Sequence, residues 1–512
     1  MAEFIMLQGT SSHVGKSILA TALCRIFLQE GRNVVPFKAQ NMALNSYVTQ
    51  DGREMGRAQV AQAEAAGLAP QVDMNPVLLK PTGNSCSQVI INGCPVGNMS
   101  AKDYHTGYSL KAFSAVQDAL KRLENRYDTI VIEGAGSPAE VNLKAHDIVN
   151  MRVAKYVQAP VLLVADIDRG GSLAALVGTL ALLDEDERAL VKGLIINKFR
   201  GDISLFTPAV EFLEEKTGKP VLGVIPYIDQ LGIDDEDSVS LEDKQEASQQ
   251  PAAVRIAVIQ LPKISNFTDF DSLQAERDAS VTYVQDGETL SKYDLIILPG
   301  SKNTAADMQW LRQSGMERHI QQALRQGTPV VGICGGYQML GQWIHDPSHT
   351  ESSLADIQGL GLLPIETVFS PKKMTSQVKG VCSELYFAGQ TIACGELEGY
   401  EIHMGQTTDT QEHVLHPIYL TQRAGKACRE VHGSARADGL VWGTYMHGIF
   451  DNDVFRRCML NALRLQKGLP ALPVSRNYRA EKQKSYDRLA HIVRQHLRMD
   501  VLQKIMKERT IK

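Results

Sequence analysis

The chain has 512 residues, of which 44% are hydrophobic and 22% charged; this exceeds what one hydrophobic core usually supports and predicts two or three domains. The net charge of -5 gives no electrostatic reason to expect a nucleic acid or an anionic membrane as a partner. The sequence has neither a membrane-length apolar run nor an N-terminal export signal, and its eight cysteines form no CxxC pair. We therefore expect a cytoplasmic protein without a zinc site or a disulfide framework.

A short apolar strand at residues 4–7 is followed by a glycine-rich loop and then by an apolar helical pattern. This context predicts a phosphate-binding loop, in which Lys16 neutralises phosphate charge and Ser17 can bind Mg²⁺. Five residues, not four, separate the two glycines of the loop, as in the dethiobiotin synthetase and MinD-like branch that it resembles. The residues expected to hold the nucleotide phosphates are Gly9, Thr10, Gly15, Lys16 and Ser17.

A second apolar strand at residues 34–37 leads into a polar, amide-rich segment. Ligands of doubly wound sheets lie at the carboxyl ends of the strands, so this segment predicts contacts with substrate or phosphate. The candidates are Lys38, Gln40 and Asn41. Asp51 and Glu54 could supply a further Mg²⁺ ligand, although a solvated helix face explains the charges around Glu54 equally well.

Three later apolar strands also end in polar residues. Glu133 closes the first of them and is expected to bind Mg²⁺ as a Walker B acid would. Asp166, Asp168 and Arg169 follow the second strand and are further substrate candidates. Asn197 follows the third strand, where a side-chain amide can bind a purine edge or serve only as a turn residue.

Alternating apolar strands and helices predict an α/β fold, with a mostly parallel sheet flanked by helices in the first domain and a second α/β sheet after it. The expected division is a phosphate-loop domain at 1–228, an acidic linker at 229–253, a second α/β domain at 254–465 and a basic helical tail at 466–512. The acidic run 234–237 within the linker could also face the active crevice. The apolar spacing in the tail indicates packing against the domain, not chemistry.

In the second domain, a β-branched run leads into Cys334, and Gly335 and Gly336 follow before a helical pattern begins. This strand, turn and helix can hold a thiol clear of the sheet and offer the Gly335 N–H to an oxyanion. A buried structural cysteine is the alternative. His447 stands late in the domain beside a glycine and is the expected catalytic base.

The acid that would orient this histidine is open at this stage. Class I glutamine amidotransferases carry His-x-Glu, but Gly448 and Ile449 follow His447 here. Either a dyad suffices, or Glu401 or Asp451 supplies the carboxylate. His403 is either part of this site or a hydrogen-bonded core histidine.

Taken together, nine motifs resemble the cobyric acid synthase family, the glutamine-dependent amidotransferases of cobalamin biosynthesis. They run in order through both domains: GTSSHVGKS, FKAQNMALNS, EGAGSPAEVNL, VADIDRGG, INKFRGD, LPGSKNT, GICGGYQMLG, GYEIHMG and YMHGIF. The resemblance implies ATP, Mg²⁺, glutamine and a corrinoid acid as ligands. It also implies amidation of the b, d, e and g carboxylates of adenosylcobyrinic a,c-diamide, giving adenosylcobyric acid.

Two alternatives stay open. One is an amidotransferase of the same type acting on a different acid, such as the a,c-diamide synthase of the same pathway. The other is a MinD-like nucleotide switch with an inert second domain. The order of the amidations, the corrinoid contacts, the ammonia route and whether the chain forms a homo-oligomer cannot be deduced from the sequence.

Overall fold

A computed structural model describes residues 2–83, 85–229, 231–234, 252–285, 290–352 and 354–508. The chain forms two compact units. The first unit comprises Met1–Ala43, Met55–Ile233 and Ala480–Lys512, and the second comprises Leu44–Glu54 and Asp234–Arg479. The observed division thus departs from the expected N-to-C order twice, at residues 44–54 and at the C-terminal tail. Most of the expected linker at 229–253, including most of its acidic run, lies outside the described residues.

The first unit is built on a six-stranded parallel sheet with the order β12-β11-β10-β1-β9-β2. Its strands are β1 (Glu3–Gly9), β2 (Val34–Phe37), β9 (Thr129–Glu133), β10 (Val161–Asp166), β11 (Val191–Phe199) and β12 (Val221–Pro226). These strands are almost entirely buried, as their continuous apolar runs predict for a parallel sheet covered by helices. The mostly parallel α/β sheet expected for this part of the chain is therefore confirmed.

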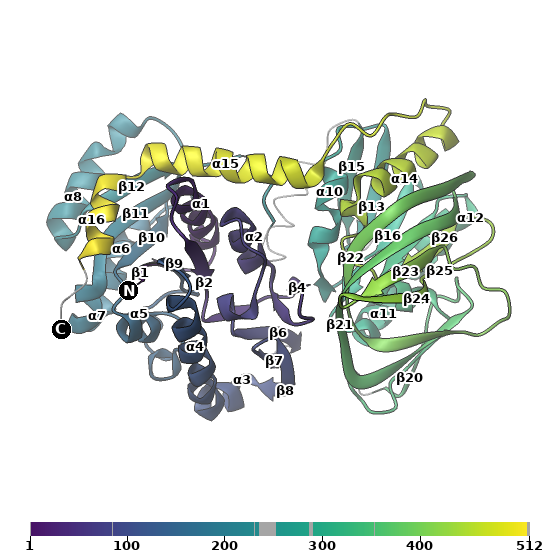
Figure 1. The fold of residues 1–512 in the computed structure, drawn as a ribbon, viewed down its shortest axis with the longest axis horizontal. Helices are drawn as coiled ribbons and strands as arrows, with labels where there is room; N and C mark the ends of the chain where they lie inside the picture. The colour runs from purple at the N-terminus through teal and green to yellow at the C-terminus, as the bar shows by residue number, and fades with distance from the viewer. Residues whose placement is uncertain are drawn as a thin grey trace. The chain divides into compact units, whose positions relative to one another are not determined.

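Helices flank this sheet, as Figure 1 shows. They are α1 (Lys16–Gln29), α2 (Arg57–Ala65), α4 (Ser109–Glu124), α5 (Met151–Val157), α6 (Ser172–Leu182), α7 (Glu185–Leu190) and α8 (Thr207–Thr217). A smaller sheet contains β3 (Gln40–Met42), β6 (Val77–Gly83), β7 (Cys86–Ile91) and β8 (Cys94–Ser100), and the short helix α3 (Ala101–Asp103) follows it.

The C-terminal tail forms α15 (Tyr478–His496) and α16 (Met499–Lys507). Leu489 and Val493 of α15 are buried in the same core as the apolar face of α1. Asp487 also accepts a 2.7 Å bond from Arg25 of α1. The tail therefore packs as expected from its apolar spacing, but it completes the first unit and not the second.

The second unit contains a sheet with the order β15-β13-β16-β18-β26-β25, parallel except for the last pair. Its strands are β13 (Val254–Ile259), β15 (Ala279–Val284), β16 (Leu295–Leu298), β18 (Val330–Ile333), β25 (Ser434–Ala435) and β26 (Val441–Thr444). Its helices are α10 (Asp271–Gln274), α11 (Thr304–Gln313), α12 (Met316–Arg325), α13 (Gly335–Leu340) and α14 (Asp453–Gln466). Two short strands, β14 (Ile264–Ser265) and β17 (Gly300–Ser301), pair beside this sheet.

A second sheet in this unit is dominated by two long antiparallel strands, β21 (Ile365–Phe387) and β22 (Gln390–Asp409). The other members are β19 (Trp343–His345), β20 (Asp356–Gln358), β23 (Ile418–Arg423) and β24 (Lys426–His432). The remaining strands are β4 (Ser46–Val48) and β5 (Glu54–Gly56), which pair with each other. Within the described part of the chain, no helix is both long and apolar enough to cross a membrane.

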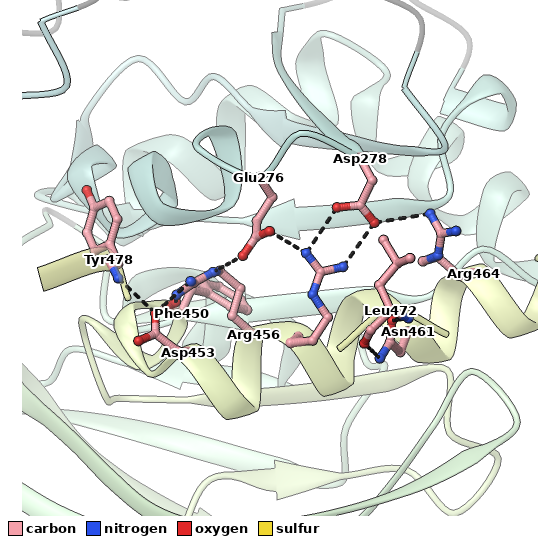
Figure 2. A network of polar contacts seen from close by, with 10 residues as sticks. Glu276, Asp278, Phe450, Asp453, Arg456, Asn461, Arg464, Leu472 and Tyr478 are labelled. Carbon is pink, nitrogen blue, oxygen red and sulfur yellow. Dashed lines mark hydrogen bonds and ion pairs between the residues drawn. The ribbon is translucent and has the colours of Figure 1, made fainter. Parts of the chain in front are cut away.

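An ion-pair network attaches α14 to the segment that follows α10 (Figure 2). The guanidinium of Arg456 lies 2.8 Å from Glu276, and Arg457 lies 3.0 Å from Asp278. Arg456 also donates a 2.8 Å bond to the Phe450 carbonyl. These pairs fix the helix after the YMHGIF motif against the chain between α10 and β15, so they join two parts of the unit that lie close in sequence to site residues.

Candidate active site

The phosphate loop has the backbone that its glycines predict. Gly15 adopts a φ of 95°, and a Cβ at this position would lie 2.1 Å from the Asn197 amide nitrogen. Both facts require glycine here. Lys16, at the start of α1, donates to the carbonyls of Ser11 at 3.0 Å and Gly136 at 3.2 Å. Its ammonium thus lies over the loop, where it can meet the charge of a bound phosphate.

Glu133 is fully buried at the carboxyl end of β9 and is surrounded by donors. Its Oε1 accepts from the Ser17 hydroxyl at 2.8 Å and from the Lys38 ammonium at 2.9 Å. Its Oε2 accepts from the Gln62 amide at 2.6 Å. The structure therefore brings together three residues predicted from separate motifs, and adds Gln62, which no local pattern indicated.

The other polar residues at this sheet edge have protein partners. Asn197 donates a 2.8 Å bond to the Val14 carbonyl and so supports the phosphate loop, while its contact with a base stays a prediction. Asp166 pairs with Lys198 at 2.8 Å, and Asp168 pairs with Arg200 at 2.8 Å. Arg169 is exposed in the turn after β10.

Gln40 and Asn41 differ in exposure. The Tyr104 hydroxyl donates to Gln40, which is half-buried, whereas Asn41 is buried and donates to Gln59 at 2.9 Å. Their contact with substrate also stays a prediction.

Asp51 and Glu54 have partners that give no support to a magnesium role. Glu54 is buried and forms an ion pair with Lys373 of β21. Asp51 is exposed and accepts from Thr49 and from Arg53, the latter at 3.2 Å. Their binding of Mg²⁺ stays a prediction that these contacts do not support. The oxygen donors that fit Mg²⁺ in the first unit are Ser17 and Glu133.

Cys334 lies on a sharp turn between β18 and α13, with φ 52° and ψ -107°. The neighbouring glycines are required by packing, since a Cβ on Gly336 would lie 1.9 Å from the Leu298 carbonyl oxygen. The thiol is 7% exposed and donates to the Ile402 carbonyl at 3.5 Å. This is the strand, turn and helix expected from the glycine pattern, and it is the geometry of a nucleophile elbow.

His447 follows β26, the neighbour of β18 in the sheet. Its Nδ1 lies 2.6 Å from the Asp269 carboxylate, which also accepts a 3.0 Å bond from the Gly448 N–H. Asp269 lies in the 3₁₀ helix Phe267–Phe270 that follows β14. A cysteine, a histidine and an orienting aspartate thus meet at one edge of the sheet, the arrangement of a nucleophilic triad.

The charge on His447 follows from its neighbours. Complete burial opposes protonation, but the charge of Asp269, the interaction with Cys334 and the hydrogen bond to Asp269 outweigh it and raise the pKa of the imidazole to about 10. Nε2 of His447 has no hydrogen-bond partner among the described residues. Since Nδ1 is held by Asp269, Nε2 is the nitrogen available for proton transfer.

The two acids proposed from the sequence are not the orienting carboxylate. Glu401 forms a close ion pair with Arg423 and lies 3.5 Å from His432. Asp451 lies in the short 3₁₀ helix directly after the histidine motif. Asp269 was missed because it lies 178 positions from His447; its only signal was an acid in the loop after the first strand of the domain.

His403 matches the second of its two alternatives. Its Nδ1 lies 2.7 Å from the Gly405 carbonyl oxygen, and its ring stacks on Tyr445 at 3.7 Å between centroids.

The oxyanion donor expected at Gly335 has a close neighbour. A Cβ on Gly335 would lie 2.8 Å from the Ser301 backbone nitrogen, so the backbone of Ser301 lies against Gly335. A pair of such donors is what a tetrahedral oxyanion requires.

Comparison with known proteins matches both halves of the chain. Residues 5–240 match the CobQ/CobB/MinD/ParA nucleotide binding domain, and residues 255–455 match the CobB/CobQ-like glutamine amidotransferase domain. The cobyric acid synthase of Moorella thermoacetica is 53% identical over 506 residues, covering 99% of this chain and 98% of that protein. The cobyric acid synthase of Pelotomaculum thermopropionicum is 54% identical over 508 residues, covering 98% and 96%. That of Salmonella choleraesuis is 50% identical over 509 residues, covering 99% of each.

A nucleotide-binding unit and a Cys-His-Asp site in one chain define a glutamine-hydrolysing, ATP-dependent ligase. The chain belongs to the cobyric acid synthase family. The resemblance expected from the nine motifs is therefore confirmed, and with it the two-part α/β architecture.

Proposed function

We propose that this enzyme amidates the b, d, e and g carboxylates of adenosylcobyrinic a,c-diamide, using ATP and glutamine, and releases adenosylcobyric acid. The observation that carries the proposal is the Cys334, His447 and Asp269 constellation in the same chain as a phosphate loop whose Ser17 and Lys38 meet on Glu133. Family membership at 50–54% identity supports the choice of substrate.

Glutamine hydrolysis would use the second unit. The Cys334 thiolate attacks the side-chain amide carbon of glutamine, and backbone N–H groups at Gly335 and Ser301 hold the oxyanion. His447 gives its proton to the leaving ammonia, and a thioester remains on the sulfur. The same imidazole then removes a proton from water, which hydrolyses the thioester to glutamate and restores the thiol.

Activation of the acid would use the first unit. A carboxylate resists ammonia because oxide is a poor leaving group, so the γ-phosphoryl group of ATP is transferred to it first. Lys16 neutralises the phosphates. Ser17 and Glu133 would hold Mg²⁺, which keeps several water and phosphate ligands and needs few from the protein. Ammonia then attacks the acyl phosphate, forming the amide and releasing phosphate.

The test is an incubation with ATP, Mg²⁺, glutamine and the a,c-diamide, followed by mass spectrometry for four successive acid-to-amide conversions. A parallel incubation replaces the a,c-diamide with cobyrinic acid, and its conversion to the a,c-diamide there, with no reaction in the first incubation, would identify the related diamide synthase activity. ATP hydrolysis without either product would leave only a nucleotide switch.

The Cys334→Ser variant separates the two reactions. It should lose glutamine-dependent amidation by about 10³-fold or more and keep amidation with added ammonium chloride, since acid activation does not use the thiol. Loss of both activities together, or of neither, would contradict the role assigned to Cys334. We further propose that the enzyme acts in the cytoplasm, where ATP is available and thiols stay reduced.

A further inference from the structure

The short strand β17 lies against two parts of the triad site. A Cβ on Gly335 would lie 2.8 Å from the Ser301 backbone nitrogen, and a Cβ on Gly300 would lie 3.4 Å from Cε1 of His447. Both residues of the strand belong to the LPGSKNT motif, and the Ser301 N–H is one of the two donors proposed for the oxyanion. The position of β17 therefore decides where this donor lies when glutamine is attacked.

A buried carboxylate holds the side chain of Ser301. Asp307, in the first turn of α11, is 1% exposed. Its Oδ2 accepts from the Ser301 hydroxyl at 2.6 Å, and the same hydroxyl accepts from the Asn303 N–H at 3.0 Å. Because the hydroxyl has an acceptor on one side and a donor on the other, the Ser301 side chain is held in one orientation.

The second oxygen of this carboxylate holds the strand that pairs with β17. Asp307 Oδ1 accepts from the Lys263 N–H at 3.1 Å, and β14 begins at the next residue and pairs with β17. The Lys302 N–H also donates to the Lys263 carbonyl at 2.9 Å. One side chain of α11 thus bonds to both sides of this two-stranded sheet.

The first turn of α11 also contacts the helix that follows the nucleophile. The Thr304 hydroxyl, on a residue that is 1% exposed, donates to the Gln338 side-chain oxygen at 3.1 Å. The Gln338 N–H in turn donates to the Cys334 carbonyl at 3.0 Å. The same helical turn is therefore bonded to the nucleophile helix through Thr304 and to β17 through Asp307, and it fixes one relative to the other.

The burial of Asp307 has an energetic cost. Burial raises its pKa to about 7, although the bonds from Ser301 and Lys263 oppose this effect. A carboxylate accepts at both oxygens and so can hold two strands at once, but only if its charge is taken out of water. Acids perturbed in this way occur preferentially at functional sites.

We propose that Asp307 is a positioning residue for glutamine hydrolysis, and that it sets the Ser301 N–H at the oxyanion by holding the Ser301 hydroxyl. The proposal rests on the proposed function and adds to it a residue that contacts neither glutamine nor the thiol. An oxyanion exists only after the thiolate has attacked, so a displaced donor lowers kcat and leaves the binding of glutamine unchanged.

The test measures glutamine hydrolysis by the full chain at about pH 8, above the pKa of Asp307. Asp307→Asn keeps the shape of the side chain and loses one of its two acceptors. Removal of a whole oxyanion donor lowers kcat by about 10²- to 10³-fold. For a displaced donor we expect a fall in kcat of about 10- to 100-fold with KM unchanged. Asp356→Asn, the same change at an exposed position on β20, should leave both constants unchanged.

Two further measurements separate positioning from folding. Ser301→Ala removes the hydroxyl and keeps the backbone N–H, so it should show the same loss, and the double variant with Asp307→Asn should lose no more than either single variant. Alkylation of Cys334 by iodoacetamide, followed by peptide mass spectrometry, needs the thiolate but forms no oxyanion. Its rate should match the parent in all three variants.

Three results would overturn the role of Asp307. They are a parent-like kcat in Asp307→Asn or a loss that appears in KM, losses that multiply in the double variant, and alkylation of Cys334 that slows as much as hydrolysis does. The last result would also reveal a variant that fails to fold. A parent enzyme with no Cys334-dependent hydrolysis at all would overturn the proposed function instead.

Discussion

Asp269 accounts for the charge state of His447. The buried imidazole is protonated over most of the pH range because negative neighbours raise its pKa to about 10. An Asp269→Asn variant loses one of these charges, so the pKa falls and the imidazolium is lost at a lower pH. We expect kcat/KM for glutamine to drop by about 10²- to 10⁴-fold and its alkaline limb to move to lower pH. A pH profile of glutamine hydrolysis measures both.

The matched control for this prediction is Asp409→Asn. Asp409 also accepts from a histidine, His416, at 3.0 Å, but the pair lies at the surface. This variant should keep the parent profile, and both variants should keep amidation with ammonium chloride. An Asp269→Asn enzyme whose alkaline limb does not move would exclude Asp269 as the charge partner of His447.

At the residue scale, the sequence identified those site residues whose roles depend on a local sequence pattern. Cys334 and Lys16 were found because glycines at fixed spacing dictate their turns, and those turns depend on neighbours in the chain. Asp269 was not found because its role depends on a contact with His447 across 178 positions. The ion pair of Glu54 with Lys373 was likewise not predicted, because nothing near Glu54 in the sequence indicated this partner.

At the element scale, α14 depends on its buried ion pairs. Arg456 is 1% exposed and bonds to Glu276, Asp453 and the Phe450 carbonyl, as Figure 2 shows. An Arg456→Met variant fills similar volume but leaves Glu276 Oε1 and the Phe450 carbonyl without this donor, while Glu276 keeps its ion pair with Arg457. We therefore expect a loss of about 1–3 kcal/mol in the stability of the second unit. The midpoint temperature for thermal inactivation of glutamine hydrolysis should fall accordingly.

Arg436→Met is the control for this prediction. Arg436 pairs with Asp438 at the surface, where removal of an ion pair costs about 0–1 kcal/mol. Equal midpoints for the two variants would show that the α14 network does not stabilise the unit.

The elements of the two parallel sheets were predictable because strands buried on both faces read as continuous apolar runs. The long hairpin of β21 and β22 could not be predicted from the sequence in this way. Its residues alternate between buried and exposed positions, and Pro371, Lys372 and Lys373 interrupt the alternation where the register shifts. Such strands are recognised only once their partners are known.

At the scale of the whole molecule, the two units are interleaved in sequence. Residues 44–54 belong to the second unit although their neighbours in sequence belong to the first. Most of α15 and all of α16, near the C-terminal end, belong to the first unit. No composition change marks either exchange, so the sequence predicted a simple N-to-C division. The C-terminal helices complete the core around α1, and the first unit therefore cannot finish folding until the last residues are present.

This dependence predicts that a substitution near the C-terminus affects the N-terminal activity. Leu489 is fully buried in the core that contains α1. Leu489→Ala should therefore destabilise the first unit by about 2–5 kcal/mol. Thermal inactivation of amidation driven by ATP and ammonium chloride should occur at a lower temperature, while inactivation of basal glutamine hydrolysis should be unchanged. Leu472→Ala, the same change at a 36% exposed site before α15, should alter neither. A Leu489→Ala enzyme that loses both activities at one lowered temperature would show that the two units unfold together, because a defect confined to one core would then have reached the other.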